Sequence, residues 1–342
     1  MFSPLTPAKV LLAWPAAGSA AIQPLTTLLE GEVLEMVAHP ELDVLDRACW
    51  PELSRKSCSR ASDGAWASLV AAACQRGMAR PAEEDQVFHG AGAEPVRAGA
   101  GGVEKIKVVG HTRHGLLRFI GIFCPINDYW VRAPRDDDKL PCVGQIAFLY
   151  LQEGEEILIG SEDFESCFKL FTLPDKRLGY FSYGKRVPGH VVGMPDREWV
   201  RPALRVVPMG WVSPVAVMQA VAREMAFGLA GTPRDAVVQK GRDLPDQSEV
   251  SILYFDSYDR LRVADEAAIT ALAGEDAPEH ERCVQVRADL GLPLNASKSL
   301  MGATRASLQG GFLDSESGAF GLEPSKGCEL AWIGLSLLSQ KT

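Results

Sequence analysis

Two apolar segments of the chain each run directly into an aspartate, and this pairing limits the folds open to the sequence more than any other feature. Ile157-Leu158-Ile159 leads into Asp163, and Ser251–Phe255 leads into Asp256. Short apolar runs of this kind predict buried strands. An aspartate at the end of a buried strand can hold a metal ion, and Phe168, five positions after Asp163, can wall off one side of a bound sugar.

The composition is that of an ordinary globular protein. The chain has 342 residues, 46% of them hydrophobic and 23% charged, which is enough for two domains or one large one. No segment reaches about 18 consecutive apolar residues, so no membrane span is expected. The apolar run near the N-terminus is short and is broken by Pro15, so no secretory signal is expected either.

The eight cysteines are scattered along the chain. No two of them have the C-x2-C or C-x4-C spacing of a zinc site. Their spread is more typical of reduced thiols than of a disulfide framework. We therefore expect an intracellular protein, in the cytoplasm or the nucleus.

Charge is distributed unevenly along the chain. The net charge of −9 argues against a nucleic-acid-binding protein, for which basic character is expected. Residues 169–205, however, contain eight basic residues against three acidic ones, with Tyr180, Phe181 and Tyr183 interleaved. This segment is either a solvated basic face or a nucleic-acid contact surface.

The first third of the chain is predicted to be a separate region. Apolar residues on one side of Ile22–Val37 and of Ala65–Met78 predict two helices, so residues 1–104 are expected to be partly helical. A run rich in glycine and alanine at 90–102 matches no phosphate-binding pattern and predicts a flexible linker. We therefore expect a boundary there, with the second region over residues 105–342.

The second region begins with a predicted β-hairpin. Lys105–Val109 alternates like a half-buried strand, His114-Gly115 reads as a turn, and Leu116–Phe123 reads as the second strand. Arg118 lies inside this second strand, and a buried arginine is costly unless it is paired. It either meets an acid across the sheet or points into a groove toward an anion such as a triphosphate.

Two later helices are also predicted. A turn at Val207–Trp211 precedes Ser213-Pro214, which is a favourable start for a helix over Val215–Leu229. The start of that helix could receive an anion or a flat ring, or it could be a plain loop-to-helix entry. A further helix is predicted over Cys283–Leu290, closed by Gly291.

Taken in chain order, seven short motifs carry the functional signal. They are Leu117-Arg118 with Pro125-Ile126-Asn127, Leu140-Pro141, Asp163 with Phe168, Val207–Gly210 with Gln219, Tyr254–Ser257, Gly291–Lys298 and Leu308–Gly311. This set, spread over about residues 105–325, resembles the fingers and palm of a reverse transcriptase of the retrotransposon type. That family has a Leu-Arg hairpin followed by Pro-x-Asn, a Leu-Pro segment, an Asp-x4-aromatic strand, a Leu-Pro-x-Gly loop before a helix with Gln, a Tyr-x-Asp-Asp hairpin, a Gly-Leu-x-Leu-Asn-x-x-Lys segment and a Leu-Gly turn.

The resemblance implies an α+β fold: a right-hand polymerase with fingers, an antiparallel palm sheet with helices on one face, and a truncated thumb. It implies an RNA-directed DNA polymerase that adds deoxynucleotides to a primer 3′-hydroxyl on an RNA or DNA template. Asp163 and Asp256 would hold two Mg²⁺ ions, which Mn²⁺ could replace, and Lys298 would lie near the leaving pyrophosphate. The resemblance implies no membrane partner and predicts no oligomeric state.

The resemblance also implies a nucleotide pocket. Phe168 would act as the gate that rejects a ribose 2′-hydroxyl. Arg118 would contact the incoming triphosphate, whose geometry suits a guanidinium group. Gly210 and Gln219 would border the pocket.

Ser257 departs from the family pattern, which has two adjacent aspartates on the hairpin where this chain has Asp256-Ser257. Serine brings no charge to a Mg²⁺ site. Asp259 lies about 7 Å further along an extended chain and is expected in or beyond the hairpin turn, so it does not replace the missing aspartate. The chain is therefore either a polymerase or a catalytically inactive relic that acts at most as a nucleic-acid-binding protein.

Overall fold

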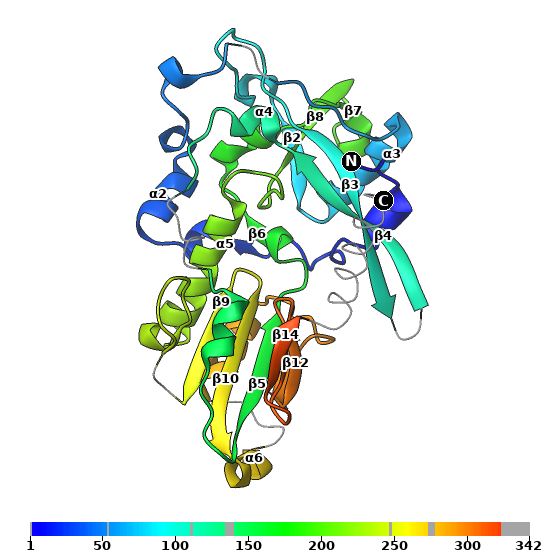
Figure 1. Cartoon of the computed structure of the whole chain (residues 1–342). Coiled ribbons are helices and arrows are strands. Elements are labelled where there is room, and N and C mark those ends of the chain that lie inside the picture. The colour runs from blue at the N-terminus through cyan, green and yellow to red at the C-terminus, as the bar shows by residue number, and fades with distance from the viewer. Residues whose placement is uncertain are drawn as a thin grey trace, which may run out of the picture. The chain divides into compact units, whose positions relative to one another are not determined.

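The computed structural model describes residues 2–52, 55–109, 112–133, 140–245, 248–272 and 278–322. The chain divides into two compact units (Figure 1), and each is assembled from segments that are far apart in the sequence. Unit 1 comprises Met1–Arg135, Glu165–Glu224 and Leu290–Pro293. Unit 2 comprises Asp136–Phe164, Met225–Asp289 and Leu294–Thr342. The boundary after residue 104 stays a prediction.

A four-stranded antiparallel sheet forms the centre of unit 2. Its order is β11 (Leu300–Ala303), β5 (Glu155–Asp163), β10 (Ser257–Asp265) and β9 (Glu249–Tyr254). The predicted strand that leads to Asp163 is confirmed as β5. The second predicted strand is confirmed as β9, which ends at Tyr254 and passes through a turn at Phe255–Asp256 into β10.

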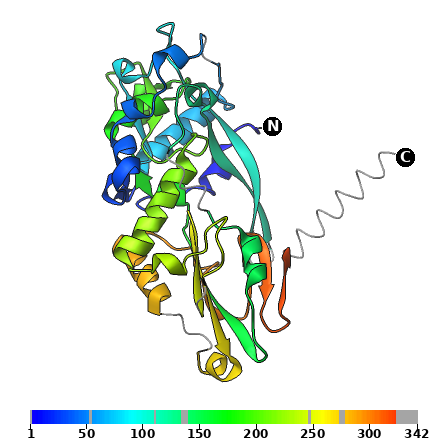
Figure 2. The same cartoon turned by 60° about the vertical axis from the view of Figure 1, so that its left-hand side comes forward.

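Different elements cover the two faces of this sheet, because alternate strand residues point to opposite sides. On one face, Ile157, Ile159 and Leu261 pack in a core with residues of η6, β12 and β13. On the other face, the ring of His280 from α7 lies 5.4 Å from that of Tyr258. Figure 2 shows the sheet between these two sets of elements. The bounds are η6 (Val143–Phe148), β12 (Arg305–Leu308), β13 (Gly311–Asp314), β14 (Ala319–Leu322), α6 (Glu266–Leu272), α7 (Pro278–Asp289) and η11 (Arg234–Ala236).

Unit 1 joins short helices, one long hairpin and two small sheets. The hairpin consists of β3 (Gly99–Val109) and β4 (Thr112–Ile122), β2–β8–β7 form an antiparallel sheet, and β1 pairs with β6 in parallel. The helical elements are α1 (Pro7–Leu11), η1 (Leu25–Thr27), α2 (Gly31–Ala38), η2 (Pro40–Leu42), η3 (Arg47–Cys49), α3 (Asp63–Gln75), η4 (Glu84–Gln86), α4 (Cys124–Asn127), η7 (Cys167–Lys169), η8 (Asp175–Phe181), η9 (Gly189–Val192) and α5 (Pro214–Arg223). The remaining strands are β1 (Gln23–Pro24), β2 (Ala79–Ala82), β6 (Phe171–Thr172), β7 (Val187–Pro188) and β8 (Trp199–Leu204).

Three predicted helices are confirmed. Ala65–Met78 corresponds to α3, whose N-cap Ser62 accepts a hydrogen bond from the Ala65 amide at 3.3 Å. The helix that starts at Pro214 is α5, and it continues as a π-helix, η10, over Glu224–Leu229. The helix predicted near Cys283 is the second half of α7.

The predicted hairpin is confirmed as β3 and β4, but its turn is not where it was predicted. His114 and Gly115 lie inside β4, where they pair with Lys107 and Ile106 of β3, respectively. Residues 99–102, part of the predicted linker, form the start of β3. Glycine is required there by close backbone approach, since a Cβ at Gly99 would lie 2.3 Å from the Cys58 carbonyl oxygen.

The helix predicted over Ile22–Val37 is wrong for its first half, where only the short turn η1 is helical among the described residues, and its second half forms α2. Pro24 lies within the first half, and a proline inside a helix removes a hydrogen bond and clashes with the preceding turn. Gln23 and Pro24 instead pair with Phe171 and Thr172 of β6, which lie far away in the sequence. Tertiary pairing therefore overrides the local apolar periodicity.

Arg177 contacts four separate segments of the chain in the interior of unit 1. Its side chain is 0% exposed, and its guanidinium donates to the Asp43 carboxylate at 3.2 Å. It also donates to two backbone carbonyls in the last turn of α2. The guanidinium carbon lies 5.1 Å from the Trp130 ring centre and 5.3 Å from that of Trp211. A fully enclosed cation is tolerated here because all its neighbours are acceptors or ring faces.

We predict that Arg177→Met lowers the free energy of unfolding by about 3–5 kcal/mol, because it leaves a buried carboxylate and two carbonyls without their donor. Arg80→Met is the matched control. Arg80 pairs with Asp175 at 3.1 Å, and both side chains are exposed. Loss of such a pair should cost at most about 1 kcal/mol. Urea unfolding compares the two variants, and equal losses would contradict the role assigned to Arg177.

Candidate functional site

The candidate site lies at one end of the β11–β5–β10–β9 sheet. Asp163 is the last residue of β5 and stands opposite Ser257, the first residue of β10. Ser257 in turn pairs with Tyr254 across the Phe255–Asp256 turn. The Phe164 amide donates to the Asp256 carbonyl at 2.8 Å, which continues the pairing beyond the strand ends. The register therefore brings Asp163 and Asp256 to neighbouring backbone positions.

Lys298 is the direct partner of Asp163. Its ammonium nitrogen lies 2.7 Å from Oδ2 of Asp163, and their side chains are 59% and 15% exposed, respectively. A turn positions the lysine: the Asn295 amide donates to the Asp163 carbonyl at 2.8 Å, and the Lys298 amide donates to the Asn295 carbonyl at 2.8 Å. Ion pairs with one exposed partner contribute little to stability, so the lysine can exchange with another cation.

Asp259 belongs to a separate, enclosed cluster on the same face of the sheet. It is 2% exposed, and its carboxylate accepts hydrogen bonds from Ser161 Oγ at 2.6 Å and from Gln309 Nε2 at 3.2 Å. It lies beyond the hairpin turn, within β10, as expected. Burial raises the pKa of Asp259 to about 6, although both hydrogen bonds and the charge of Arg287 act in the opposite direction.

Side-chain contacts on the opposite face of the sheet hold the residues next to the site. The guanidinium carbon of Arg287, from α7, lies 4.4 Å from the Phe164 ring centre and 5.8 Å from that of Tyr258. Tyr258 Oη lies 3.1 Å from Ser251 Oγ, and Arg260 Nη1 donates to the same Ser251 oxygen at 3.1 Å. These contacts fix the residue after Asp163 and the residue after Ser257.

The four residues predicted to form the nucleotide pocket lie in unit 1. Arg118 is exposed on β4, opposite Val103, and so it does not meet an acid across its own hairpin. Phe168 is in η7, and Gln219 is 1% exposed on α5. Their grouping with Asp163 stays a prediction.

Gly210 occupies a backbone position that only glycine fits well. Its φ is +107°, and a Cβ there would lie 2.3 Å from the Gly121 carbonyl oxygen of β4. Its own carbonyl accepts a hydrogen bond from Asn127 Nδ2 at 2.9 Å. The predicted tight turn before α5 is therefore held directly against the end of the hairpin.

Much of the positive charge of segment 169–205 is paired with acids of unit 1, although Lys176, Arg186 and Arg197 are exposed. Arg186 and Arg201 both bond the Glu84 carboxylate, at 2.7 and 2.9 Å. Lys185 lies 2.8 Å from Asp63. Two of the three interleaved aromatic side chains are buried. The acids in these pairs come from the first hundred residues, so they offset part of the local surplus of positive charge.

Two carboxylates, Asp163 and Asp256, are the candidate metal donors. Carboxylate oxygen is the ligand that Mg²⁺ and Mn²⁺ prefer, so the donor chemistry at the end of β5 fits a divalent cation. Ser257 adds no charge, and each carboxylate oxygen of Asp259 already accepts a hydrogen bond, one from Ser161 and one from Gln309. Within the described ranges, no group of three or more His, Cys, Asp or Glu side chains is placed to hold a metal.

The sequence alone missed the partners of the site residues. The ion pair of Lys298 with Asp163 joins residues that are far apart in the sequence, and so does the bond of Gln309 with Asp259. Strand register could have indicated the Ser161–Asp259 contact, because it follows once Asp163 is set opposite Ser257.

Neither a family model nor a curated protein sequence matches this chain. Among solved structures, the chain is similar to a foamy viral protease-reverse transcriptase in complex with double-stranded DNA, with a TM-score of 0.51 and 9% sequence identity. The match covers 94% of this chain and 51% of that one, so the chain spans about half the length of that protein. This likeness shows a reverse-transcriptase-like fold. No helix in the described ranges is long and apolar enough to cross a membrane.

We predict that Asp259→Asn changes how the unfolding free energy depends on pH. A carboxyl group whose folded pKa is raised stabilises the fold below its unfolded pKa, and this contribution is lost as the pH rises through the folded pKa. The pKa of Asp259 is raised from 3.8 to about 6. Between about pH 4 and pH 7, the unfolding free energy of wild type should therefore fall by about 3 kcal/mol relative to that of the variant.

Urea unfolding of both proteins across this pH range measures the difference. Asp235→Asn, which changes an exposed aspartate of the same unit, is the control and should run parallel to wild type. Parallel curves for Asp259→Asn as well would show that the buried carboxyl does not titrate as described.

Proposed function

We propose that this chain is an RNA-directed DNA polymerase-like domain that adds deoxynucleotides to a primer 3′-hydroxyl by two-metal nucleotidyl transfer. One observation carries the proposal: in a reverse-transcriptase-like fold, the register of β5 and β10 sets Asp163 beside the hairpin turn that contains Asp256. RNA or DNA template with primer, and deoxynucleoside triphosphates, are the proposed partners.

The aspartates and Lys298 have distinct proposed roles. Asp163 and Asp256 would hold the Mg²⁺ or Mn²⁺ ions. Such ions, when bound, activate the primer hydroxyl and neutralise charge on the leaving pyrophosphate. Lys298 balances the charge of Asp163 in the structure described here, at 2.7 Å. Because its side chain is largely exposed, it is able to turn from the carboxylate to a phosphate group when a nucleotide enters.

The remaining predicted residues would form the nucleotide side of the site. Arg118 is exposed on β4, which leaves its guanidinium open to a triphosphate. Phe168 would exclude a ribose 2′-hydroxyl, and Gly210 and Gln219 would border the pocket. Gly210 lies in a turn that approaches the Gly121 backbone closely, which suits a residue that borders a pocket.

A second candidate is a nucleic-acid-binding protein without polymerase activity. Ser257 favours it directly, because it stands opposite Asp163 where a carboxylate would add charge for a metal. The Lys298 contact favours it as well, because the lysine competes with a cation for the same carboxylate oxygen. In this case the fold would retain duplex binding while chemistry is lost.

Primer extension on an RNA template, with Mg²⁺ or with Mn²⁺, tests both candidates. We predict slow extension by wild type, no extension by Asp163→Ala, and at least a tenfold gain in Ser257→Asp, the size expected for a carboxylate ligand at a catalytic metal site. Ser297→Asp is the matched control, because it adds the same charge at an exposed serine near Lys298.

Fluorescence anisotropy with a labelled primer–template duplex separates the outcomes. Extension by wild type that is lost in Asp163→Ala supports the polymerase. If only Ser257→Asp extends the primer and wild type still binds the duplex, the result supports the nucleic-acid-binding protein without polymerase activity. Neither extension nor duplex binding in any variant would refute both candidates.

A further inference from the structure

Unit 1 contains an apolar cavity that none of the predicted site residues lines. Its walls come from α3, β4, β8 and the segment before α5, and Trp66, Phe119 and Tyr183 form an aromatic box on one side. The cavity leaves about 50 Å³ for the centres of water-sized molecules. A single water needs roughly 10–15 Å³ by this measure, so the space admits a compact group rather than one solvent molecule.

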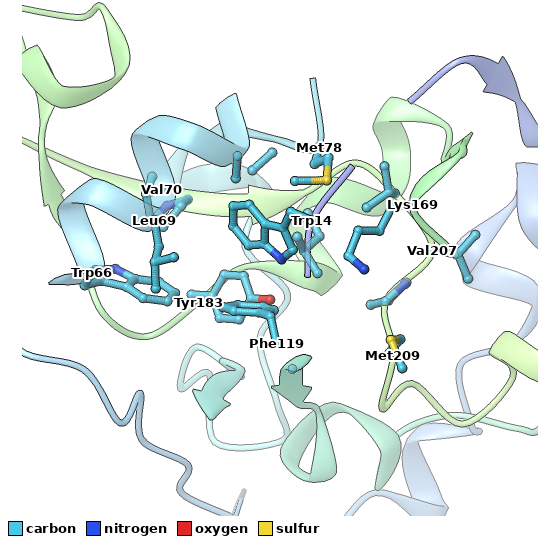
Figure 3. A pocket seen from close by; sticks show the side chains of 17 residues that line it. Trp14, Trp66, Leu69, Val70, Met78, Phe119, Lys169, Tyr183, Val207 and Met209 are labelled. Atoms are coloured by element: carbon cyan, nitrogen blue, oxygen red, sulfur yellow. The ribbon is translucent and has the colours of Figure 1, made fainter. Parts of the chain in front are cut away.

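Three polar groups face this apolar space (Figure 3). The Tyr183 hydroxyl and the Trp14 indole N–H are buried, and neither has a hydrogen-bond partner among the residues that the structure describes. Tyr183 as a whole is 2% exposed. The third group is the ammonium of Lys169, whose side chain points toward the other two. Buried polar groups without partners are rare in folded proteins and call for an explanation.

Among the described residues, Lys169 forms no ion pair with a carboxylate. Burial first, and then the positive charge of Arg118, lower the pKa of Lys169 to about 8, and Lys105 acts in the same direction. Among the described residues that line the cavity, none is acidic. Indole N–H and ammonium groups only donate hydrogen bonds, and a tyrosine hydroxyl can also donate. The missing component is therefore an acceptor with negative charge.

We propose that this cavity is a binding site for a small carboxylic acid with a compact apolar body. The carboxylate would accept hydrogen bonds from Lys169, Tyr183 and Trp14, and the apolar body would lie against the aromatic box. A carboxylate is an acceptor-only group, which matches a set of donors without an acid. The apolar lining argues against a bare inorganic anion, which would gain nothing from those walls.

Benzoate is the probe, and calorimetric titration of the full chain is the measurement. We expect one binding site for benzoate, with benzyl alcohol and acetate each at least tenfold weaker. Benzyl alcohol keeps the ring and loses the charge, and acetate keeps the charge and loses the ring. Equal binding of benzyl alcohol would overturn the role of Lys169, and equal binding of acetate or inorganic phosphate would overturn the role of the apolar walls.

Two variants locate the site. Lys169→Met keeps the length of the side chain and should weaken benzoate at least tenfold, the range of a charge-assisted hydrogen bond. Lys176→Met, at an exposed lysine nearby in the sequence, is the matched control and should bind benzoate as wild type does. Tyr183→Phe removes one buried hydroxyl and should weaken benzoate severalfold, which keeps the proposal testable if Lys169→Met does not fold. Benzoate binding that neither variant changes, or no benzoate binding to wild type, would overturn the proposal.

Discussion

The pairing of β5 with β10 is the interaction on which the rest of unit 2 depends. It runs over nine residue pairs, from Asp163 opposite Ser257 to Glu155 opposite Asp265. Side chains alternate between the two faces, so a slip of one residue would move the whole apolar set from the core to the other side. The same register that buries Ile157 and Ile159 therefore also sets Asp163 at the hairpin turn and Ser161 against Asp259.

Electrostatic matching between distant segments organises unit 1. The cation of Arg177 is enclosed by Asp43 and two tryptophan rings, and Glu84 accepts from both Arg186 and Arg201. A run of positive charge in the sequence is therefore no measure of positive surface. Lys169 of this segment differs from these, because none of the described residues that line the cavity it faces is acidic. That difference is the reason for proposing an anionic ligand there.

The parts of the fold that could be predicted from the sequence are those set by local pattern. The strand before Asp163, the strand before Asp256 and the helix after Ser213 each have a short-range signal, and the structure contains all three. The ordered motifs also indicated a reverse-transcriptase-like fold, which the likeness to a solved structure supports. The proposed roles of the site residues remain proposals.

The parts that could not be predicted depend on contacts between distant residues. Gln23 and Pro24 pair with β6 instead of entering a helix, and residues 99–102 form the start of β3, where Gly99 permits close approach to the Cys58 backbone. The partner of Lys298 and the burial of Asp259 are likewise visible only after the sheet is assembled. Local propensity predicts none of these four features.

We propose that Asp163 and the hairpin turn form one cation site for which Lys298 competes. Titration with Mn²⁺, followed by electron paramagnetic resonance of the free ion, tests it most directly with wild type, Asp163→Asn and Lys298→Met. Removal of a competing charge near a carboxylate should tighten binding about fivefold, and removal of the carboxylate charge should weaken it by at least as much. We therefore expect Mn²⁺ to bind most tightly to Lys298→Met, less tightly to wild type and most weakly to Asp163→Asn. Equal Mn²⁺ affinity in all three proteins would contradict it.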